Sequence, residues 1–479
     1  MNISLGKGGE VKIILAFKDK ERVDYAEELY TYLKEREIFE GNSGQVFAHI
    51  SPKEERVLFL GLGEEDKVSL ESLRKAFFNA GRELMKLKVE SIDITIPEFK
   101  GLDYLDAVQA IAEGLLQSEY SFEKYLSEKR TITSIKDVYI DVIDGKEEES
   151  TKAIEEVQNI IEGVFLARNL INEPNMTMTP EILANKAKEE LEEVGVKVDI
   201  LNKEEIEKLG MNALLAVSQG SIEEPRLIVM TYEGDPESKE NIVFVGKGLM
   251  FDSGGYCLKP AKGMDAMHGD MAGAAAVIGA IKSIAKSGLK KNVIGIVAAC
   301  ENLISGKAYK PGDIIKSMSG KTIEVTNTDC EGRLVLADAL WYAANNIKAD
   351  KIIDIATLTG ACLVALGDIT SGAITNDEEL MKHVKKASER AGEPIWQLPN
   401  SDEYKELNKG TFADLTNQGK GAGAITAGLF LGEFVKDTPW VHLDIAGTSY
   451  LSSPRGYLPK GATGVHTKTL YYLVKNLEG

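Results

Sequence analysis

Two carboxylates, Asp329 and Glu331, lie two residues apart in the segment NTDCEGRL (327–334). A turn would explain the asparagine, the aspartate and the glycine of this segment, because these residue types are common in turns. It would not explain why Glu331 is followed so soon by Arg333. An apolar run typical of a helix, LVLADALWYAANN (334–346), comes next. The segment therefore places acidic and basic groups where a helix is expected to begin.

Two upstream segments carry further charged residues. GKGLMFDSGGYCLK follows the apolar run NIVFV and holds Lys247, Asp252 and Lys259, and MDAMHGDMAG holds Asp270. Taken singly, an aspartate beside a glycine usually belongs to a turn or a helix cap. The GKG sequence also lacks the spacing of a phosphate-binding loop. These segments gain meaning only when they are considered together.

Brought together by a fold, the four carboxylates of these segments would repel one another strongly in the absence of cations. Divalent metal ions are the natural compensation, and a pair of ions is one standard arrangement. The chain has five histidines and no HExxH motif, so carboxylates would have to do most of the binding. A nearby lysine could stabilise an oxyanion as an ammonium or bind metal as a neutral amine. The spacing alone does not say which lysine does which.

Cys330 lies between two of these carboxylates. On an extended segment, Asp329 and Glu331 at positions i and i+2 point the same way and Cys330 points the opposite way. We therefore expect Cys330 to pack as a small buried side chain rather than to bind metal. The four cysteines of the chain are too few and too scattered for a disulfide framework or a CxxC zinc site, which fits a reducing, cytoplasmic setting.

The first part of the chain alternates short apolar runs with charged helical stretches, which predicts an α/β domain. The expected strands are 11–17, 57–63 and 91–96, and the expected helices are 24–36 and 72–87. An acidic segment, DGKEEES (144–150), precedes a long amphipathic run at 150–172. We predict an N-terminal domain over residues 1–148 with an oligomerisation or regulatory role, a linker helix over 149–172 and a catalytic domain over 173–479.

The alternation resumes after a helix that we expect to begin at Pro180 with Thr179 as its N-cap. The expected strands are 197–201, 226–234, 241–248, 292–300, 322–328, 351–358 and 441–447. Several are apolar throughout, which is typical of strands covered on both faces. The prediction is an α/β protein of two domains, the larger with a mixed, mostly parallel central sheet. Sites in such sheets form at the carboxyl ends of strands, where the charged segments lie.

The composition of the chain argues against two classes of partner, nucleic acids and membranes. The formal net charge of −19 disfavours a general affinity for nucleic acid or for an anionic membrane. No apolar run approaches the length of about 18 residues that a membrane-spanning helix needs. The start of the chain shows no small-residue cleavage pattern, so we expect no signal peptide.

At this point the motifs resemble those of a known family, the leucyl aminopeptidases or M17 metallopeptidases. NTDCEGRL resembles the NTDAEGRL signature, and VGKGLMFDSGGYCLKP resembles the VGKG-x-x-FDSGG-x-x-x-K pattern. MHGDMAGAAAV resembles the M-x-x-DM-x-GAA block, and the order and gaps agree over about residues 167–470. Two departures stand out: Cys330 replaces the usual alanine, and His268 stands where lysine-containing variants are common.

The resemblance implies hydrolysis of N-terminal residues, preferably leucine or other apolar ones, from peptides by a water that bridges two divalent ions. The ions would be zinc or manganese, with magnesium as an alternative. They would share Asp252 and Glu331. Asp329 would bind the more exchangeable ion, and Lys247 and Asp270 the tighter one.

The resemblance also implies roles for the groups around the metals. Lys259 would contact the scissile carbonyl oxygen, and Arg333 would position a bicarbonate as general base. The resemblance further implies a homohexamer and a pocket for the first side chain of the substrate. That pocket would be lined by Met267, Thr357, Gly360 and Ala446.

Three rival interpretations remain. A two-metal phosphoesterase would be expected to have more histidine ligands. DNA binding, known for some members of the resembled family, is disfavoured by the acidic balance. A degenerate member with structural metals only would be expected to lack some of the metal and catalytic positions, and all seven are filled.

Overall fold

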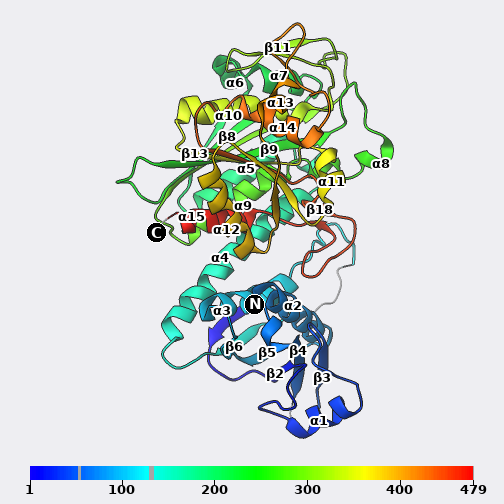
Figure 1. The fold of residues 1–479 in the computed structure, drawn as a ribbon, viewed down its shortest axis with the longest axis vertical. Coiled ribbons are helices and arrows are strands. Elements are labelled where there is room, and N and C mark those ends of the chain that lie inside the picture. The colour runs from blue at the N-terminus through cyan, green and yellow to red at the C-terminus, as the bar shows by residue number, and fades with distance from the viewer. Residues whose placement is uncertain (52–55, 129–133, 478–479) are drawn as a thin grey trace. The chain divides into compact units, whose positions relative to one another are not determined.

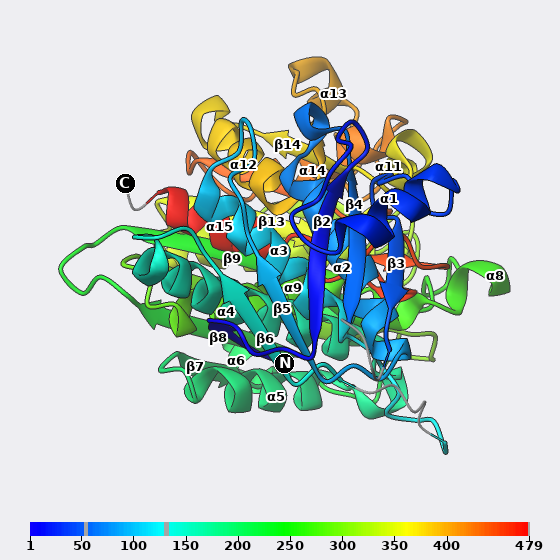
Figure 2. The same cartoon turned by 90° about the horizontal axis from the view of Figure 1, so that it is seen from below.

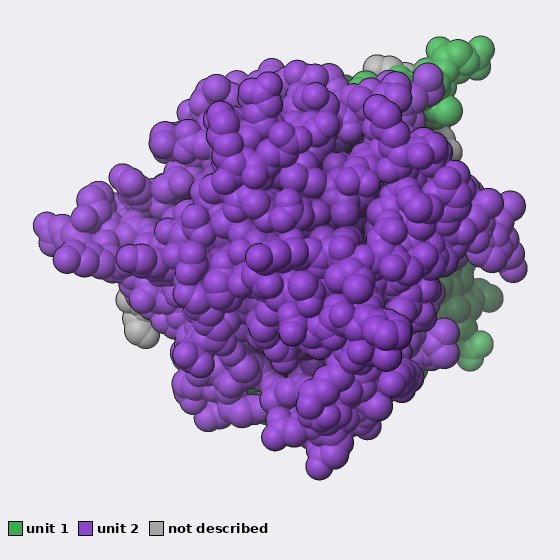
Figure 3. Space-filling view, turned by 90° about the horizontal axis from the view of Figure 1, so that it is seen from above, with its two compact units in different colours: residues 1–161, 453–459 green, residues 162–452, 460–479 purple. Residues whose placement is uncertain are grey.

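The computed structural model describes residues 1–51, 56–128 and 134–477. The chain divides into two compact units, one of residues 1–161 with 453–459 and one of residues 162–452 with 460–479 (Figure 3). The division falls inside helix α4 (Glu147–Asn172), which the sequence analysis treated as a separate linker. The segment 453–459 belongs to the first unit, where the hydroxyl of Tyr457 donates to Glu71 Oε2 at 3.1 Å.

The first unit is built on a six-stranded sheet in the order β1-β6-β5-β2-β4-β3, whose strands lie side by side in Figure 2. Every pair of neighbouring strands in this sheet is parallel except the antiparallel pair β3–β4. The strands are β1 (Asn2–Leu5), β2 (Val11–Phe17), β3 (Val46–His49), β4 (Val57–Gly63), β5 (Ser91–Thr95) and β6 (Asp137–Asp141). The helices are α1 (Glu27–Glu35), the short η1 (Glu65–Lys67), α2 (Leu70–Lys86) and α3 (Tyr104–Ser118).

The second unit is built on an eight-stranded sheet in the order β15-β14-β17-β13-β9-β10-β8-β7. The strands are β7 (Lys197–Leu201), β8 (Arg226–Glu233), β9 (Asn241–Asp252), β10 (Asn292–Asn302), β13 (Lys351–Ala356), β14 (Ser371–Thr375), β15 (Ile395–Gln397) and β17 (Trp440–Asp444). The four pairs β9–β10, β9–β13, β13–β17 and β14–β15 are parallel, and the other three pairs are antiparallel. The predicted mixed, mostly parallel sheet is therefore confirmed.

Helices cover both faces of this sheet, which explains why its central strands are apolar throughout. On one face α9 (Ala272–Lys286) packs on β9, and α5 (Pro180–Glu192), α12 (Glu378–Ala391) and α15 (Thr467–Asn476) lie with it. On the other face α10 (Glu331–Tyr342) packs on β9, and α7 (Asn212–Ser218) and α14 (Gly423–Gly432) lie against α10. Figure 1 shows these two groups on opposite sides of β8 and β9.

The remaining elements are short. They are η2 (Asn175–Thr177), α6 (Lys203–Leu209), α8 (Ala261–Met264), η3 (Met267–Gly269), the π-helical turn η4 (Ala343–Ile347), α11 (Gly360–Leu366) and α13 (Asp402–Glu406). A small sheet contains β11 (Ile314–Lys316), β12 (Thr322–Glu324) and β16 (Leu415–Thr416), and a hairpin contains β18 (Tyr450–Leu451) and β19 (Gly461–Ala462).

One predicted strand is wrong. The run TIEVTNT (322–328) was expected to belong to the central sheet, but only Thr322–Glu324 form a strand, and it lies in the small sheet. The apolar residues Ile323 and Val325 are buried under α10 and its neighbours instead. After Glu324 the chain leaves the strand and leads into a turn that carries the acidic residues.

Candidate functional site

Strand β9 supplies two of the charged groups at its carboxyl end, Lys247 and Asp252. They lie five positions apart, so a regular strand would point them to opposite faces. The pairing with β10 shifts by one residue, because Cys300 pairs with Leu249 and Glu301 pairs with Phe251. Met250 is thus an extra residue, a β-bulge, and it brings Asp252 back to the face of Lys247. Both side chains are buried, each 2% exposed.

The turn before α10 supplies Asp329 and Glu331. Its backbone is held by Asn327, whose Oδ1 accepts the Asp329 N–H at 2.8 Å and whose carbonyl accepts the Cys330 N–H at 3.3 Å. Cys330 is the N-cap position and Glu331 is the first residue of α10. The expectation of an extended segment is therefore wrong. The two carboxylates converge because a turn is followed at once by a helix.

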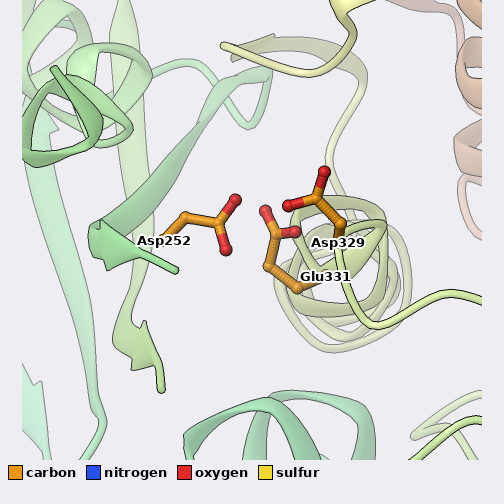
Figure 4. Close-up of side chains that lie close together, drawn as sticks. All are labelled: Asp252, Asp329 and Glu331. Carbon is orange, nitrogen blue, oxygen red and sulfur yellow. The ribbon is translucent and has the colours of Figure 1, made fainter. Parts of the chain in front are cut away.

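The three carboxylates Asp252, Asp329 and Glu331 each offer an oxygen, and these oxygens all lie within 4.8 Å of one another. Figure 4 shows Asp252 at the end of its strand facing Asp329 and Glu331 at the start of the helix, with the carboxylates pointing toward one another. Asp252 and Glu331 are buried, whereas the Asp329 side chain is one-third exposed. The cluster therefore has two buried members, Asp252 and Glu331, and one partly exposed member, Asp329, which a ligand can reach.

Two lysines complete the charged cluster. Lys247 Nζ lies 2.7 Å from Asp270 Oδ2 and 3.0 Å from Glu331 Oε1. Lys259 Nζ lies 2.8 Å from Asp252 Oδ2 and 2.6 Å from Asp329 Oδ1. The ion pairs thus form two triplets, one around each lysine, and the proximity of Asp252, Asp329 and Glu331 brings the two together.

The carboxylates and the lysines shift one another's pKa values. Burial alone would lower the pKa of Lys247, but the charges of Asp270, Glu331 and Asp252 outweigh it and raise that pKa. Lys259 behaves in the same way beside Asp252 and Glu331. Burial, followed by the charge of Asp252, raises the pKa of Glu331, and burial also raises the pKa of Asp270.

This donor set fits divalent cations. Four carboxylates face two ammonium groups, which leaves excess negative charge in a buried place. Within the described part of the chain, the buried Glu331 Oε2 has no hydrogen-bond partner. An unsatisfied buried carboxylate oxygen at the centre of an acidic cluster is expected to bind a cation. Carboxylate oxygens suit hard divalent ions, and a lysine nitrogen could bind only after losing its proton.

Gly332, the second residue of α10, lets Lys247 reach the cluster. A Cβ atom at this position would lie 2.4 Å from Lys247 Cε and 2.7 Å from its Nζ. Any side chain here would displace the lysine from the two carboxylates that it contacts. The glycine in NTDCEGRL is therefore required by the close approach of the lysine.

Sequence reasoning missed the amides that hold these segments. Asn302, at the end of β10, donates from Nδ2 to Asp252 Oδ1 and to the Thr328 carbonyl. Asn417, fully buried after β16, accepts the Thr326 N–H at 2.8 Å and donates to the Asn327 carbonyl at 2.6 Å. The polar pair that ends the apolar run of β10 was a signal for Asn302. No comparable signal existed for Asn417.

The predicted pocket residues come from three separate elements. Met267 begins η3, Thr357 and Gly360 follow β13, and Ala446 follows β17. Thr357 adjoins the charged cluster, because its hydroxyl donates to Asp270 Oδ1 at 2.6 Å and its carbonyl accepts from Lys247 Nζ at 2.8 Å.

Asp444 connects the loops after β13 and β17, and sequence reasoning did not identify it. Its Oδ1 accepts the N–H groups of Leu358 and Ala446, at 3.2 and 3.1 Å. Its Oδ2 accepts the Thr359 hydroxyl at 2.7 Å. One buried carboxylate therefore fixes both loops that carry the predicted pocket residues.

Arg333 is the third residue of α10, two positions after Glu331. It lines a cavity of about 290 Å³. The cavity is also lined by Asp329, Cys330, Thr359, Gly360 and the glycine-rich segment that leads into α14. Arg333 is 6% exposed, and its Nε has no hydrogen-bond partner among residues 1–51, 56–128 and 134–477. Cys330 is partly buried in this wall and is not among the grouped candidate ligands, so the buried packing role predicted for it is confirmed only in part.

The family of the chain follows from its sequence. Residues 165–471 match the catalytic domain of the cytosol aminopeptidase family, and residues 14–129 match the N-terminal domain of the same family. The chain belongs to this family, as the resemblance of its motifs indicated. Membership supports a metal-dependent aminopeptidase and therefore a hydrolase.

Individual relatives cover the whole chain. A probable cytosol aminopeptidase of Clostridium tetani is 64% identical over 100% of both chains. One of Treponema denticola is 48% identical over 99% of both. Among solved structures, the bottromycin maturation enzyme BotP is 31% identical with a TM-score of 0.88, covering 98% of this chain and 100% of its own, and it has also been solved in complex with Mn.

None of the helices that the structure describes combines the length and the apolar character needed to cross a membrane.

Proposed function

We propose that the protein removes N-terminal residues, with a preference for leucine and other apolar side chains, by means of two divalent metal ions that activate a water molecule. The observation that carries this proposal is the convergence of Asp252, Asp329 and Glu331 within 4.8 Å beside two lysines. The cytosol aminopeptidase names of the full-length relatives support the reaction class.

The cluster offers ligands for two ions. Asp252 and Glu331 are both buried, each contacts one of the two lysines, and they are the candidates for shared ligands. Asp270 and Lys247, both buried, would complete an inner site, and the more exposed Asp329 would complete an outer, more exchangeable one. When bound, two such ions supply a water of lowered pKa and polarise a carbonyl group. Zinc or manganese fits this set, with magnesium as an alternative.

Lys259 is proposed to stabilise the oxyanion. Its ammonium group is held in place by Asp252 and Asp329 and is partly exposed, so it can meet a substrate carbonyl oxygen without leaving the cluster. Its raised pKa keeps it protonated at neutral pH. A preorganised cation at the position where negative charge develops lowers the barrier.

Arg333 is proposed to hold an anion, such as bicarbonate, that takes up a proton during the reaction. The buried Nε–H without a partner supports an anion site in the cavity. The position near the start of α10 favours negative charge as well. Every carboxylate in the cluster is engaged as a candidate metal ligand, so the chain itself leaves no obvious base.

The pocket for the first side chain is proposed to lie between the loops that Asp444 fixes. Thr357, Gly360 and Ala446 are carried by these loops, and Met267 lies three residues before Asp270. A free substrate amine is itself a metal ligand, which would select the first residue of a peptide over internal residues.

The test uses purified protein freed of metal and then supplied with Zn²⁺, Mn²⁺ or Mg²⁺ in turn. We expect cleavage of leucine p-nitroanilide and no cleavage of its N-acetylated form, because acetylation removes the free amine. An aryl phosphate serves as the comparison substrate. Cleavage of the phosphate alone, or of the acetylated amide equally well, would contradict the proposal.

A homohexamer in the cytoplasm, with the N-terminal domain contributing to assembly, completes the proposal. Light scattering of the full chain coupled to gel filtration would measure its mass against the 52.3 kDa of one chain. A monomer at micromolar concentration would contradict this part only.

A further inference from the structure

Asn302 is the residue through which the two acidic segments are joined. It is fully buried at the carboxyl end of β10, and it pairs directly with Asp252 across the strands. The bulge at Met250 produces this pairing, because in a regular register Asn302 would face a different residue. The position of Asn302 is therefore set by the same irregularity that aims Asp252.

The side chain of Asn302 makes two contacts that differ in kind. Its Nδ2 donates to Asp252 Oδ1 at 2.8 Å and to the carbonyl oxygen of Thr328 at 2.9 Å. Thr328 directly precedes Asp329 in the turn before α10. One amide group thus ties a carboxylate of the strand to the backbone of the turn that carries the other two.

The backbone of Asn302 holds the same strand end a second time. Its carbonyl oxygen accepts from Ser253 N at 3.0 Å and from Ser253 Oγ at 2.8 Å. The loop packs so closely that a Cβ on Gly255 would lie 3.0 Å from Asn302 Oδ1. Asp252 is consequently held on both sides, by its neighbour in sequence and by β10.

These contacts fix the orientation of the Asp252 carboxylate. Asp252 Oδ1 accepts from Gly254 N at 2.8 Å and from Asn302 Nδ2, whereas Oδ2 pairs with Lys259 Nζ at 2.8 Å. Without Asn302, Oδ1 keeps a single donor and the carboxylate can rotate about its last bond. The two acidic segments would also lose the hydrogen bond that fixes their separation.

We propose that Asn302 is a positioning residue that sets the affinity of the site for its divalent cations by orienting Asp252 and fixing the Asp329–Glu331 turn against it. The inference rests on the proposed function for the presence of metal. Hydrogen bonds to ligating carboxylates commonly account for ten- to hundredfold in metal affinity.

The experiment measures Mn²⁺ binding directly. Metal-free full-length protein is titrated with Mn²⁺ in competition with a fluorescent chelator, for the wild type, Asn302→Ala and Asn302→Ser. We expect the alanine variant to bind about 10- to 100-fold more weakly. The serine variant should fall between, since a hydroxyl can donate to one of the two acceptors but cannot reach both. If the alanine variant does not fold, the serine variant decides alone.

Asn292→Ala is the matched control. Asn292 lies at the opposite end of the same strand, is 8% exposed, and also makes two side-chain hydrogen bonds, with Asp235 N and the Ser238 carbonyl, each at 3.0 Å. Its loss should lower the unfolding temperature without changing Mn²⁺ affinity. Equal loss of affinity in both variants would mean general destabilisation and would overturn the inference, as would wild-type affinity in the Asn302 variants.

Activity gives an independent readout. At saturating Mn²⁺ the Asn302→Ala variant should regain the wild-type kcat, because its defect lies in metal occupancy. A wild type that binds Mn²⁺ but cleaves no aminoacyl amide would contradict the proposed function and leave the affinity comparison intact. A wild type that binds no Mn²⁺ would contradict both.

Discussion

Lys259 differs from the other charged groups of the site because it pairs with the cluster while remaining partly open to solvent. The assigned role predicts that Lys259→Ala lowers kcat about 100- to 1000-fold, the usual range for loss of an oxyanion donor. Metal content should persist, since the removal of a competing ammonium leaves Asp252 and Asp329 free to bind. Metal analysis and steady-state kinetics check both parts.

Lys262→Ala is the control for that variant, because Lys262 lies three residues away and is exposed. It should behave as the wild type. Full peptidase activity in Lys259→Ala would rule out the oxyanion role, and loss of metal would instead make Lys259 part of the binding site.

Glu331→Ala, unlike Lys259→Ala, is expected to lose metal binding. Glu331 lies at the centre of the cluster, 3.0 Å from Lys247 Nζ, and its Oε2 is free among the described residues. Its removal should abolish both metal binding and activity. A Glu331→Ala protein that retained the wild-type metal content would show that the acidic cluster is not the binding site.

The pH dependence of metal binding follows from the pKa shifts. Burial raises the pKa of Glu331 and of Asp270, and the surrounding carboxylates raise the pKa of Lys247. A metal ion competes with protons on all three groups, so binding releases protons and the affinity rises with pH. Titration calorimetry of Mn²⁺ binding between pH 6 and about pH 8.5 should show weaker binding at the lower pH, where carboxylates of raised pKa hold more protons. A pH-independent Kd would contradict this.

At the scale of elements, helix α10 joins the site to the interior. Its first turn carries Glu331 and Arg333, and farther along it Asp338 is fully buried. Asp338 accepts the N–H groups of Ala213 and Leu214 with Oδ2, at 2.8 and 3.1 Å. Its Oδ1 accepts the Met318 N–H at 2.8 Å. The N-cap residue of α7 has no side-chain cap of its own, so α10 supplies it.

Asp338→Ala is therefore expected to destabilise the protein by about 3 kcal/mol, because two buried N–H groups and one partly buried N–H group lose their acceptor. Asp350→Ala is the control: Asp350 is exposed and accepts one N–H, from Asn241 at 2.7 Å, and its loss should cost less than about 1 kcal/mol. Urea unfolding measures both. A difference below about 0.5 kcal/mol between the two variants would contradict the assigned role, since it is within the usual error of additivity.

The same elements show what the sequence could predict. The apolar strands β7, β8, β9, β13 and β17 were located to within a few residues, and Thr179 caps α5 at Ile182 N as expected. Hydrophobic patterning locates strands because it reflects burial. The residue types at a helix start locate the cap because capping is local. Strand β14, which lies between β15 and β17, and the edge strand β15 escaped notice, and the three residues of β15 carry too little pattern.

The charged residues of the site were all named from their types and spacing, yet the reason given for one pair was wrong. Asp329 and Glu331 converge through a turn and a helix start, which alternation along a strand does not describe. Asn302, Asn417 and Asp444 act through contacts between segments far apart in the chain. A single sequence does not show which distant segments these side chains join, so their roles required the structure.

At the scale of the whole molecule, each unit has a hydrophobic core of its own. Residues such as Ile14, Tyr30 and Phe59 form one in the first unit, and Leu249, Leu336 and Trp440 belong to another in the second. The proposed metal ligands all lie in the second unit. Mn²⁺ at 100 times its Kd should stabilise that unit by about 2.7 kcal/mol and leave the first unit unchanged.

Differential scanning calorimetry with and without Mn²⁺ tests this expectation. We expect two transitions, of which one moves to higher temperature with metal. A single transition that moves as a whole would show that the units unfold together, and two transitions that both stay in place would show that the second unit binds no metal.

The extra residue at Met250 also limits how this ligand set can be transplanted. A protein engineer who copied Lys247 and Asp252 onto a regular parallel strand at the same spacing would aim one of them into the opposite layer of the host. A working copy would need the whole irregular end of β9 together with Asn302 on the neighbouring strand β10. Conversely, deleting Met250, whose side chain is not among the grouped acidic ligands, is expected to disable the site as thoroughly as removing a ligand.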